Sequence, residues 1–199
     1  MIGKTAFKNL KNLFKKVETE LNKNLRINQT EKYWNQYYDV TDISITPWND
    51  KLVTCNACCG GMISGKHPDI VLKELLALYG INKKFQWEEH LLKYLKSSEF
   101  KCKKITFPVA WPVARKIFDR ELKKMRDEID KGNIIFYHKK GHYQIMVGYQ
   151  DDNFIFNDPA GDRKISKKLR ERKSGKNVVY PYSMVKSEKI YGRCWSIEI

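Results

Sequence analysis

The chain has 199 residues, of which 42% are apolar and 13% aromatic, so it has enough apolar material to bury a hydrophobic core and is not a disordered protein. It carries 38 basic and 23 acidic side chains, a formal net charge of +15. No run of about 18 apolar residues is present, which excludes a transmembrane helix of ordinary length.

The positive charge is unevenly distributed along the sequence. Residues 1–28 carry seven basic and two acidic side chains, and residues 163–176 carry eight basic and one acidic side chain. Concentrated positive charge attracts polyanions such as nucleic acid, anionic lipid headgroups or bacterial cell wall. Residues 163–176 are therefore a candidate binding segment for an anionic polymer. The alternative is that both segments are solvated basic surface.

The first predicted element is an amphipathic helix over residues 5–26. Its apolar side chains recur at steps of three and four residues with lysines between them, at Phe7, Leu10, Phe14, Val17, Leu21 and Leu25. Such a helix packs on its own domain, on a partner or on a membrane surface. We divide the chain into a basic helical arm, residues 1–28, and a folded domain, residues 29–199. Residues 29–54 are rich in turn-forming residues and predict an irregular lead-in.

A group of cysteines follows this lead-in. The chain has five unevenly spaced cysteines, at Cys55, Cys58, Cys59, Cys102 and Cys194. An odd number at such spacing is poor material for a disulfide framework, so we expect free thiols. A helix is expected to begin near Cys55, although Gly60 and Gly61 lower its intrinsic propensity.

Three further helices are predicted downstream. Pro68 and Asp69 begin the first, and Gly80 ends it. A second is expected around residues 87–95, and a third over residues 115–131, where a charged amphipathic pattern stops at a glycine. The residues expected to face the core are Ile70, Val71, Leu75, Leu76, Leu78, Trp87, Leu91, Leu92, Leu95, Ile117, Phe118, Leu122, Met125 and Ile129.

The second part of the chain is rich in β-forming residues. Turn signals at residues 139–141 and 151–152 separate short apolar runs. The predicted strands cover residues 134–137, 142–149, 153–157, 178–182 and 194–199. Helices followed by an antiparallel sheet predict an α+β fold within one domain.

One predicted hairpin carries residues that suit catalysis. His142 opens one apolar strand, and Asp158 closes the next, 16 residues later. Antiparallel pairing of these strands would place an imidazole beside a carboxylate. An ordinary cysteine thiol is mostly protonated at neutral pH, and a helix N-terminus with an adjacent imidazolium favours its reactive thiolate. Cys55, His142 and Asp158 are therefore candidates for a nucleophile, a base and the residue that orients the base.

The same residues carry a family resemblance. The run Cys55-Asn56-Ala57-Cys58-Cys59 resembles the cysteine-bearing helix start of papain-like peptidases. The run from Lys131 through Gly141-His142-Tyr143 to Asp158-Pro159-Ala160-Gly161 is similar to the end of the bacteriocin-leader-peptidase-like superfamily, in which a histidine strand precedes an Asp-Pro-x-Gly turn. The resemblance covers roughly residues 30–165.

The resemblance implies a papain-like fold with a cysteine nucleophile at the start of a buried helix, a histidine base on a strand and an aspartate that orients the histidine. It also implies an upstream glutamine whose side-chain amide helps to form the oxyanion hole, for which Gln36 is the candidate. Gln36 lies 19 residues before Cys55, so an inserted loop is required. Cys58 and Cys59 stand where small hydroxylated residues usually follow the nucleophile, and they are expected to be inert core.

Two other kinds of site compete with this interpretation. Cys55, Cys58 and Cys59 with Cys102 or a histidine would supply zinc ligands, but a second paired motif at zinc-site spacing is missing. A non-enzymatic basic module would bind nucleic acid or another anionic surface through the basic segments and the tryptophans Trp34, Trp48 and Trp111. His67, His90 and His138 lack a matching context and are expected to be structural or exposed.

We therefore predict a papain-like cysteine hydrolase that cleaves a peptide or amide bond without a metal or cofactor. The basic charge favours a bacterial or phage enzyme that acts on peptidoglycan, and a toxin-type protease is the enzymatic alternative. The first residues lack the long apolar core of a secretory signal, so we expect synthesis in the cytoplasm. A cell-wall substrate would then require release or export by a non-classical route.

Overall fold

The computed structural model describes residues 25–30, 32–41, 54–79, 87–106, 114–139, 141–165, 174–187 and 190–199. In these segments helices dominate the first half of the chain and strands dominate the second half. Every strand pairing is antiparallel. The predicted α+β class is therefore confirmed.

The sheet has seven strands in the order β2-β7-β3-β4-β5-β6, with β1 paired to β4. In chain order they are β1 (Leu25–Ile27), β2 (Cys102–Thr106), β3 (Ile134–Lys139), β4 (His142–Gln150), β5 (Asn153–Asn157), β6 (Val178–Pro181) and β7 (Ile190–Ile197). The turn between β3 and β4 contains Gly141 at φ 70°, a left-handed backbone that glycine adopts without strain. The strands β3, β4, β5 and β6 follow one another in the chain and lie side by side, and they form the centre and one edge of the sheet.

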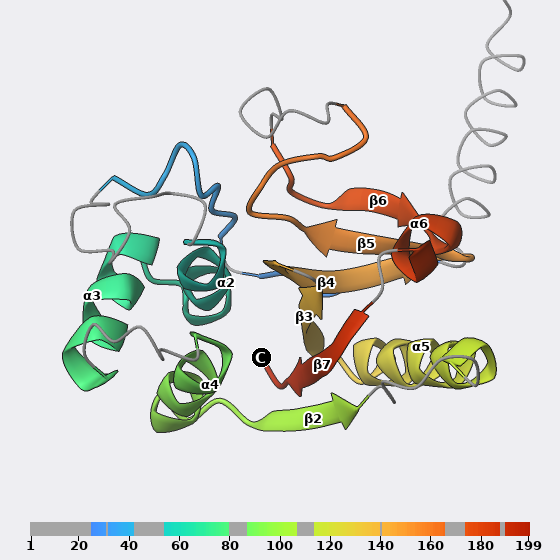
Figure 1. Cartoon of the computed structure of the whole chain (residues 1–199), viewed down its shortest axis with the longest axis horizontal. Helices are drawn as coiled ribbons and strands as arrows, with labels where there is room; N and C mark the ends of the chain where they lie inside the picture. Colours follow the sequence, from blue (N-terminus) through green and yellow to red (C-terminus); the bar gives the residue numbers. More distant parts are fainter. Residues whose placement is uncertain are drawn as a thin grey trace, which may run out of the picture.

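Helices cover both faces of this sheet (Figure 1). On one face lie α2 (Cys55–Ser64), α3 (Pro68–Tyr79) and α4 (Trp87–Ser97), and on the other lie α5 (Ala114–Asp130) and α6 (Tyr182–Ser187). Successive residues of a strand point to opposite faces. Ile134 and Phe136 therefore join the core under α2 to α4, whereas Ile135 and Tyr137 join the core under α5 and α6. Burial on both faces explains why β3 has no polar alternation.

Most predicted elements agree with the structure. The helices begin and end within a few residues of the expected positions, and the strands of the β3-β4-β5 meander lie where turn signals placed them. The prediction is wrong for two residues of α3 that were expected to face the core, since Ile70 is 48% exposed and Leu78 is 57% exposed. The elements β1, β2 and α6 were not predicted. All five cysteines are free, as expected.

The end of the predicted basic arm is a strand. Leu25 to Ile27 form β1, so the helix expected over residues 5–26 does not extend to its predicted end. The next residue, Asn28, donates side-chain hydrogen bonds to the carbonyls of Ile129 (2.7 Å) and Asn133 (2.6 Å) at the end of α5. Residues 1–24 lie outside the described residues, as do 42–53 of the irregular lead-in. Among the helices that the structure describes, none is long and apolar enough to cross a bilayer.

The pairing of β1 with β4 predicts a strict requirement for glycine at position 148. A Cβ atom on Gly148 would lie 2.0 Å from the Arg26 carbonyl oxygen and 3.0 Å from the Ile27 Cα. Gly148→Ala should therefore displace β1 and lower the free energy of unfolding by about 1–3 kcal/mol, as overpacking does. Urea denaturation measures this loss. Lys104→Ala, at an exposed position of β2, is the control and should change it by less than about 0.5 kcal/mol; equal stability of the two variants would contradict this packing.

Candidate active site

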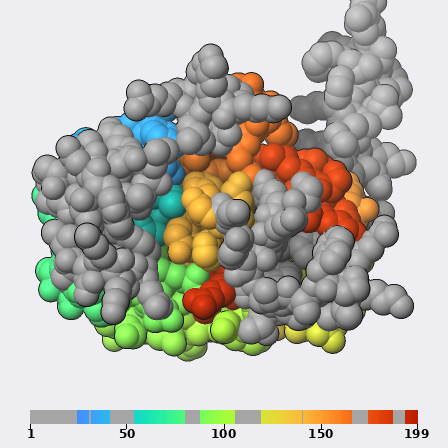
Figure 2. Space-filling view, in the orientation of Figure 1, coloured from blue at the N-terminus to red at the C-terminus, as the bar shows by residue number. Residues whose placement is uncertain are grey.

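The helix α2 begins at Cys55 and is buried along its length. Nine of its ten residues, Cys55 to Ile63, are buried. Glycines permit this burial, since a Cβ on Gly60 would lie 2.8 Å from Leu91 and one on Gly61 would lie 2.7 Å from the Lys66 carbonyl oxygen. The helix therefore forms through packing between the other helices and the sheet, despite its two glycines. In Figure 2, its surface (teal) adjoins that of β3 and β4 (amber).

The hairpin of β4 and β5 places His142 beside Asp158. His142 is the first residue of β4, Asp158 follows the last residue of β5, and antiparallel pairing brings these two ends together. The Nε2 atom of His142 lies 2.7 Å from Oδ1 of Asp158. The predicted histidine and aspartate therefore form a hydrogen-bonded pair.

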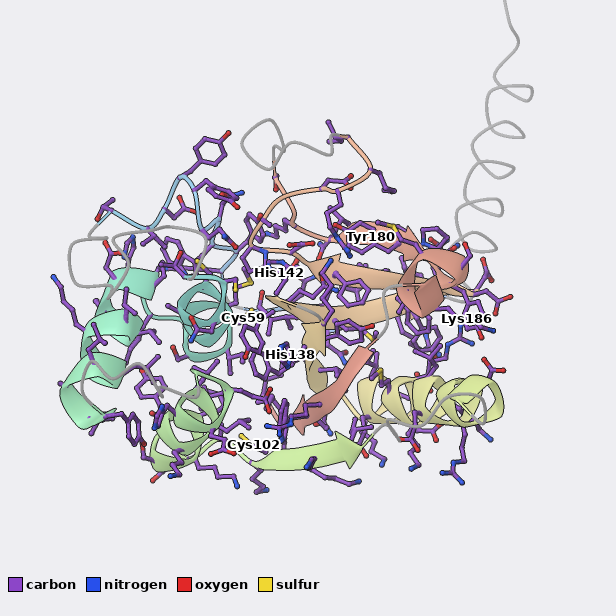
Figure 3. The ribbon with its side chains drawn as sticks, viewed as in Figure 1. Cys59, Cys102, His138, His142, Tyr180 and Lys186 are labelled. Carbon is purple, nitrogen blue, oxygen red and sulfur yellow. The ribbon has the colours of Figure 1, made fainter. Side chains whose placement is uncertain are left out.

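The structure also brings Cys55 to this pair. Cys55 lies close enough to His142 to act on its imidazole, because interaction with Cys55 is one of the causes that raise the pKa of His142. In Figure 3 His142 lies between α2 and the sheet. Since Nε2 faces Asp158, the other ring nitrogen, Nδ1, is the one on which the sulfur would act. The fold thus brings Cys55, His142 and Asp158 together, although Cys55 is 87 residues before His142 in the sequence.

The charge of Asp158 controls the protonation of His142. Burial disfavours the charged imidazolium, but the Asp158 carboxylate and its hydrogen bond outweigh burial, and Cys55 adds to their effect. Together they raise the pKa of His142 to about 9. A pKa of about 9 corresponds to a protonated ring at neutral pH, with Nε2 donating toward Asp158.

Asp158 is completely buried, and both oxygens of its carboxylate have polar partners. Oδ1 faces His142 and accepts a hydrogen bond from the backbone amide of Ala160 (2.9 Å). Oδ2 accepts one from the Tyr180 hydroxyl (3.1 Å) and lies 3.0 Å from Nε of Arg163. Burial alone would raise the pKa of Asp158, but the positive charges of His142 and Arg163 hold it well below its usual value. The carboxylate is therefore ionised and fixed in place.

Gln36 lies beside the Asp158 turn. Its backbone amide donates to the carbonyl of Pro159 (3.0 Å), and its side chain is buried. In the same lead-in, the Tyr33 hydroxyl donates to the carbonyl of Asp158 (2.8 Å) and accepts from the amide of Gly175 (2.8 Å). The structure thus brings the backbone of Gln36 to the Asp158 turn. The loop expected between Gln36 and Cys55 cannot be followed beyond residue 41, because 42–53 lie outside the described residues.

Sequence reasoning missed Arg163, Tyr33 and Tyr180. Arg163 was assigned to the basic segment 163–176 as a candidate contact for an anionic polymer, but its side chain is only 8% exposed and pairs with Asp158. Its position five residues after Asp158, directly after the Gly161-Asp162 turn, is the signal that could have found it. Residues 166–173 lie outside the described residues.

The remaining cysteines and histidines lie in different environments. Cys58 and Cys59 are buried, and burial raises the pKa of both thiols, in agreement with the core role predicted for them. His138 pairs through Nδ1 with Glu88 (2.9 Å) and stacks on Tyr143. Within the described part of the chain, no group of three or more histidine, cysteine or acidic side chains has a geometry that could hold a metal ion.

Comparison with known proteins adds no assignment to this geometry. No protein-family model matches the chain, and no curated protein matches its sequence.

The different environments of the cysteines predict selective alkylation. Iodoacetamide at about pH 6 should modify Cys55 first, because Cys58 and Cys59 are completely buried thiols with raised pKa values, whereas Cys55 is 4% exposed and lies beside His142. Peptide mapping by mass spectrometry identifies the labelled residue. His142→Ala is the matched variant and should slow labelling of Cys55, since it removes the imidazolium. Equal labelling of the three cysteines in the folded protein would contradict the assignment.

The pairing of His142 with Asp158 also predicts a pH dependence. His142 should titrate near pH 9 by NMR, and Asp158→Asn should lower its midpoint by about one to three pH units, because the stabilising charge is lost. Since the folded pKa of His142 is above the ordinary value of 6.5, the contribution of His142 protonation to stability is present below about pH 6.5 while Asp158 stays ionised, and it is lost as the pH rises through about 9. His90, whose pKa is lowered by burial and Lys93, is the internal control. A His142 midpoint that is the same in both proteins would rule out the pairing.

Proposed function

We propose that the protein is a papain-like cysteine hydrolase that cleaves a peptide or amide bond. The observation that carries the proposal is the position of Cys55 beside the hydrogen-bonded pair of His142 and Asp158. A nucleophile, a base within hydrogen-bond reach and a third group that orients the base are the parts that covalent acyl transfer requires. The raised pKa of His142 supports a resting imidazolium beside the sulfur.

In the proposed reaction, the Cys55 sulfur attacks the carbonyl carbon of the scissile amide. The imidazolium of His142 then gives its proton to the departing amine, and a thioester remains on Cys55. Neutral His142 next takes a proton from water, which attacks the thioester and releases the acid and the thiolate. Asp158 stays ionised throughout and holds the His142 ring in the required orientation.

Stabilisation of the oxyanion is assigned to two donors. They are the backbone amide of Cys55, at the start of α2, and the side-chain amide of Gln36. Donors placed where negative charge develops contribute about 3–4 kcal/mol each to catalysis in acyl transfer. The hydrogen bond of the Gln36 backbone to Pro159 supports this assignment because it ties Gln36 to the catalytic turn.

The net charge of +15 favours a substrate carried by an anionic polymer. Among peptide-bearing polymers, bacterial peptidoglycan combines amide bonds with carboxylates and phosphate-bearing wall material. We therefore propose the stem peptides of peptidoglycan as the first substrate class to test, ahead of free peptides. Incubation of the protein with purified peptidoglycan and with a peptide library, followed by mass spectrometry of the fragments, distinguishes the two.

Substitution of the three central residues tests the mechanism. Cys55→Ala and His142→Ala should each lower hydrolysis by about 10⁴-fold or more, whereas Asp158→Ala should retain roughly 10- to 100-fold more activity than either, because it orients the base and does not transfer a proton. Release of fragments from peptidoglycan or from a cleaved peptide measures this. Cys102→Ala, which changes a half-buried thiol on β2, is the control and should remain active. A fully active His142→Ala protein would refute the proposal.

A further inference from the structure

The environment of Asp158 identifies an additional residue of the site. Resting on the proposed function, we propose that Arg163 is a positioning residue that fixes the carboxylate of Asp158 toward His142. Its Nε lies 3.0 Å from Oδ2 of Asp158, the oxygen opposite the one that faces His142. The two cations therefore hold the carboxylate from opposite sides.

Arg163 is itself held rigidly, as positioning requires. Its guanidinium lies over the ring of Tyr180, with Cζ 4.2 Å from the ring centroid. A second guanidinium nitrogen, Nη2, donates to Oε1 of buried Gln144 (3.4 Å), and the backbone amide of Arg163 donates to the Tyr180 hydroxyl (3.2 Å). These contacts come from β4 and β6, so Arg163 links the Asp158 turn to both strands.

Arginine suits this place better than lysine for a geometric reason. A planar guanidinium can stack on an aromatic ring and bond to a carboxylate and an amide at the same time, whereas an ammonium on a flexible stem is a point charge. The hydroxyl of Tyr180 bonds to the same oxygen, Oδ2, that Arg163 faces. Loss of the planar group would therefore leave Oδ2 with one fixed partner and allow the carboxylate to rotate away from His142.

The charged and titratable groups around the carboxylate fix the expected signs. Asp158 interacts with His142, Arg163 and Lys139, and the hydroxyls of Tyr180 and Tyr33 bond to its side chain and its carbonyl, respectively. His142 faces Asp158 on one side and Cys55 on the other. Removal of the Arg163 charge takes away one cation that favours the ionised form of the Asp158 carboxylate. It also lets the carboxylate rotate away from His142, which weakens the effect of the second cation. The titration midpoint of Asp158 should therefore rise.

The test compares Arg163→Met with Arg163→Lys in the full-length protein. In Arg163→Met, the ¹³C NMR titration of the Asp158 carboxylate should move up by about one to three pH units, and hydrolysis should fall by about 10- to 100-fold, as for a reacting group displaced by about 1 Å. Arg163→Lys keeps the charge, so its titration should stay near that of the wild type while hydrolysis falls to an intermediate level. Arg120→Gln, at an exposed arginine of α5, should change neither.

Several results would overturn the inference. Unchanged hydrolysis in a folded Arg163→Met protein, or an unchanged Asp158 titration, would show that Arg163 does not position the carboxylate. If Arg163→Met does not fold, unchanged hydrolysis by Arg163→Lys decides against the inference. Failure of the proposed function is separable, because wild-type protein without hydrolysis would still report on Arg163 through the Asp158 titration and through the rate at which iodoacetamide alkylates Cys55.

Discussion

The structure depends on the burial of one ionised carboxylate. Asp158 is 0% exposed, and a buried charge costs several kcal/mol unless it is paired and hydrogen-bonded. Its partners come from β4, from its own turn, from the segment that follows and from β6. These parts of the chain must therefore be correctly placed before the charge is compensated, which couples the geometry of the proposed catalytic pair to the stability of the fold.

The backbone of the same turn joins the lead-in to the sheet. The carbonyl of Asp158 accepts from Tyr33, and the amide of Asp158 donates to the carbonyl of Gly175. A Cβ on Gly175 would lie 2.1 Å from that Asp158 carbonyl oxygen, so only glycine fits where the basic segment returns to the turn. Both ends of the basic segment, Arg163 and Gly175, are thus anchored at Asp158. This arrangement explains why a segment that reads as solvated charge contains buried, structural residues.

Features set by neighbouring residues could be predicted from the sequence, and features set by distant ones could not. The His142–Asp158 pair follows from hairpin geometry, and α3 follows from its proline start and apolar spacing. By contrast, β1 gains its conformation from pairing with residues 148–150, more than 120 positions away. The local pattern assigns the charge of Arg163 to the surface, and its burial is explained by its contacts with Asp158 and with Tyr180 on β6.

The proposed nucleophile belongs to a different part of the fold from its base. His142 and Asp158 are fixed within the sheet, whereas Cys55 is fixed by the packing of α2 against α3, α4 and β4. The interaction between Cys55 and His142 therefore spans the interface between the helical layer and the sheet. Close packing at Gly60 and Gly61 sets the position of α2 in that interface. A side chain added at either glycine would therefore shift the sulfur relative to the His142–Asp158 pair, whose two members the β4–β5 hairpin holds together.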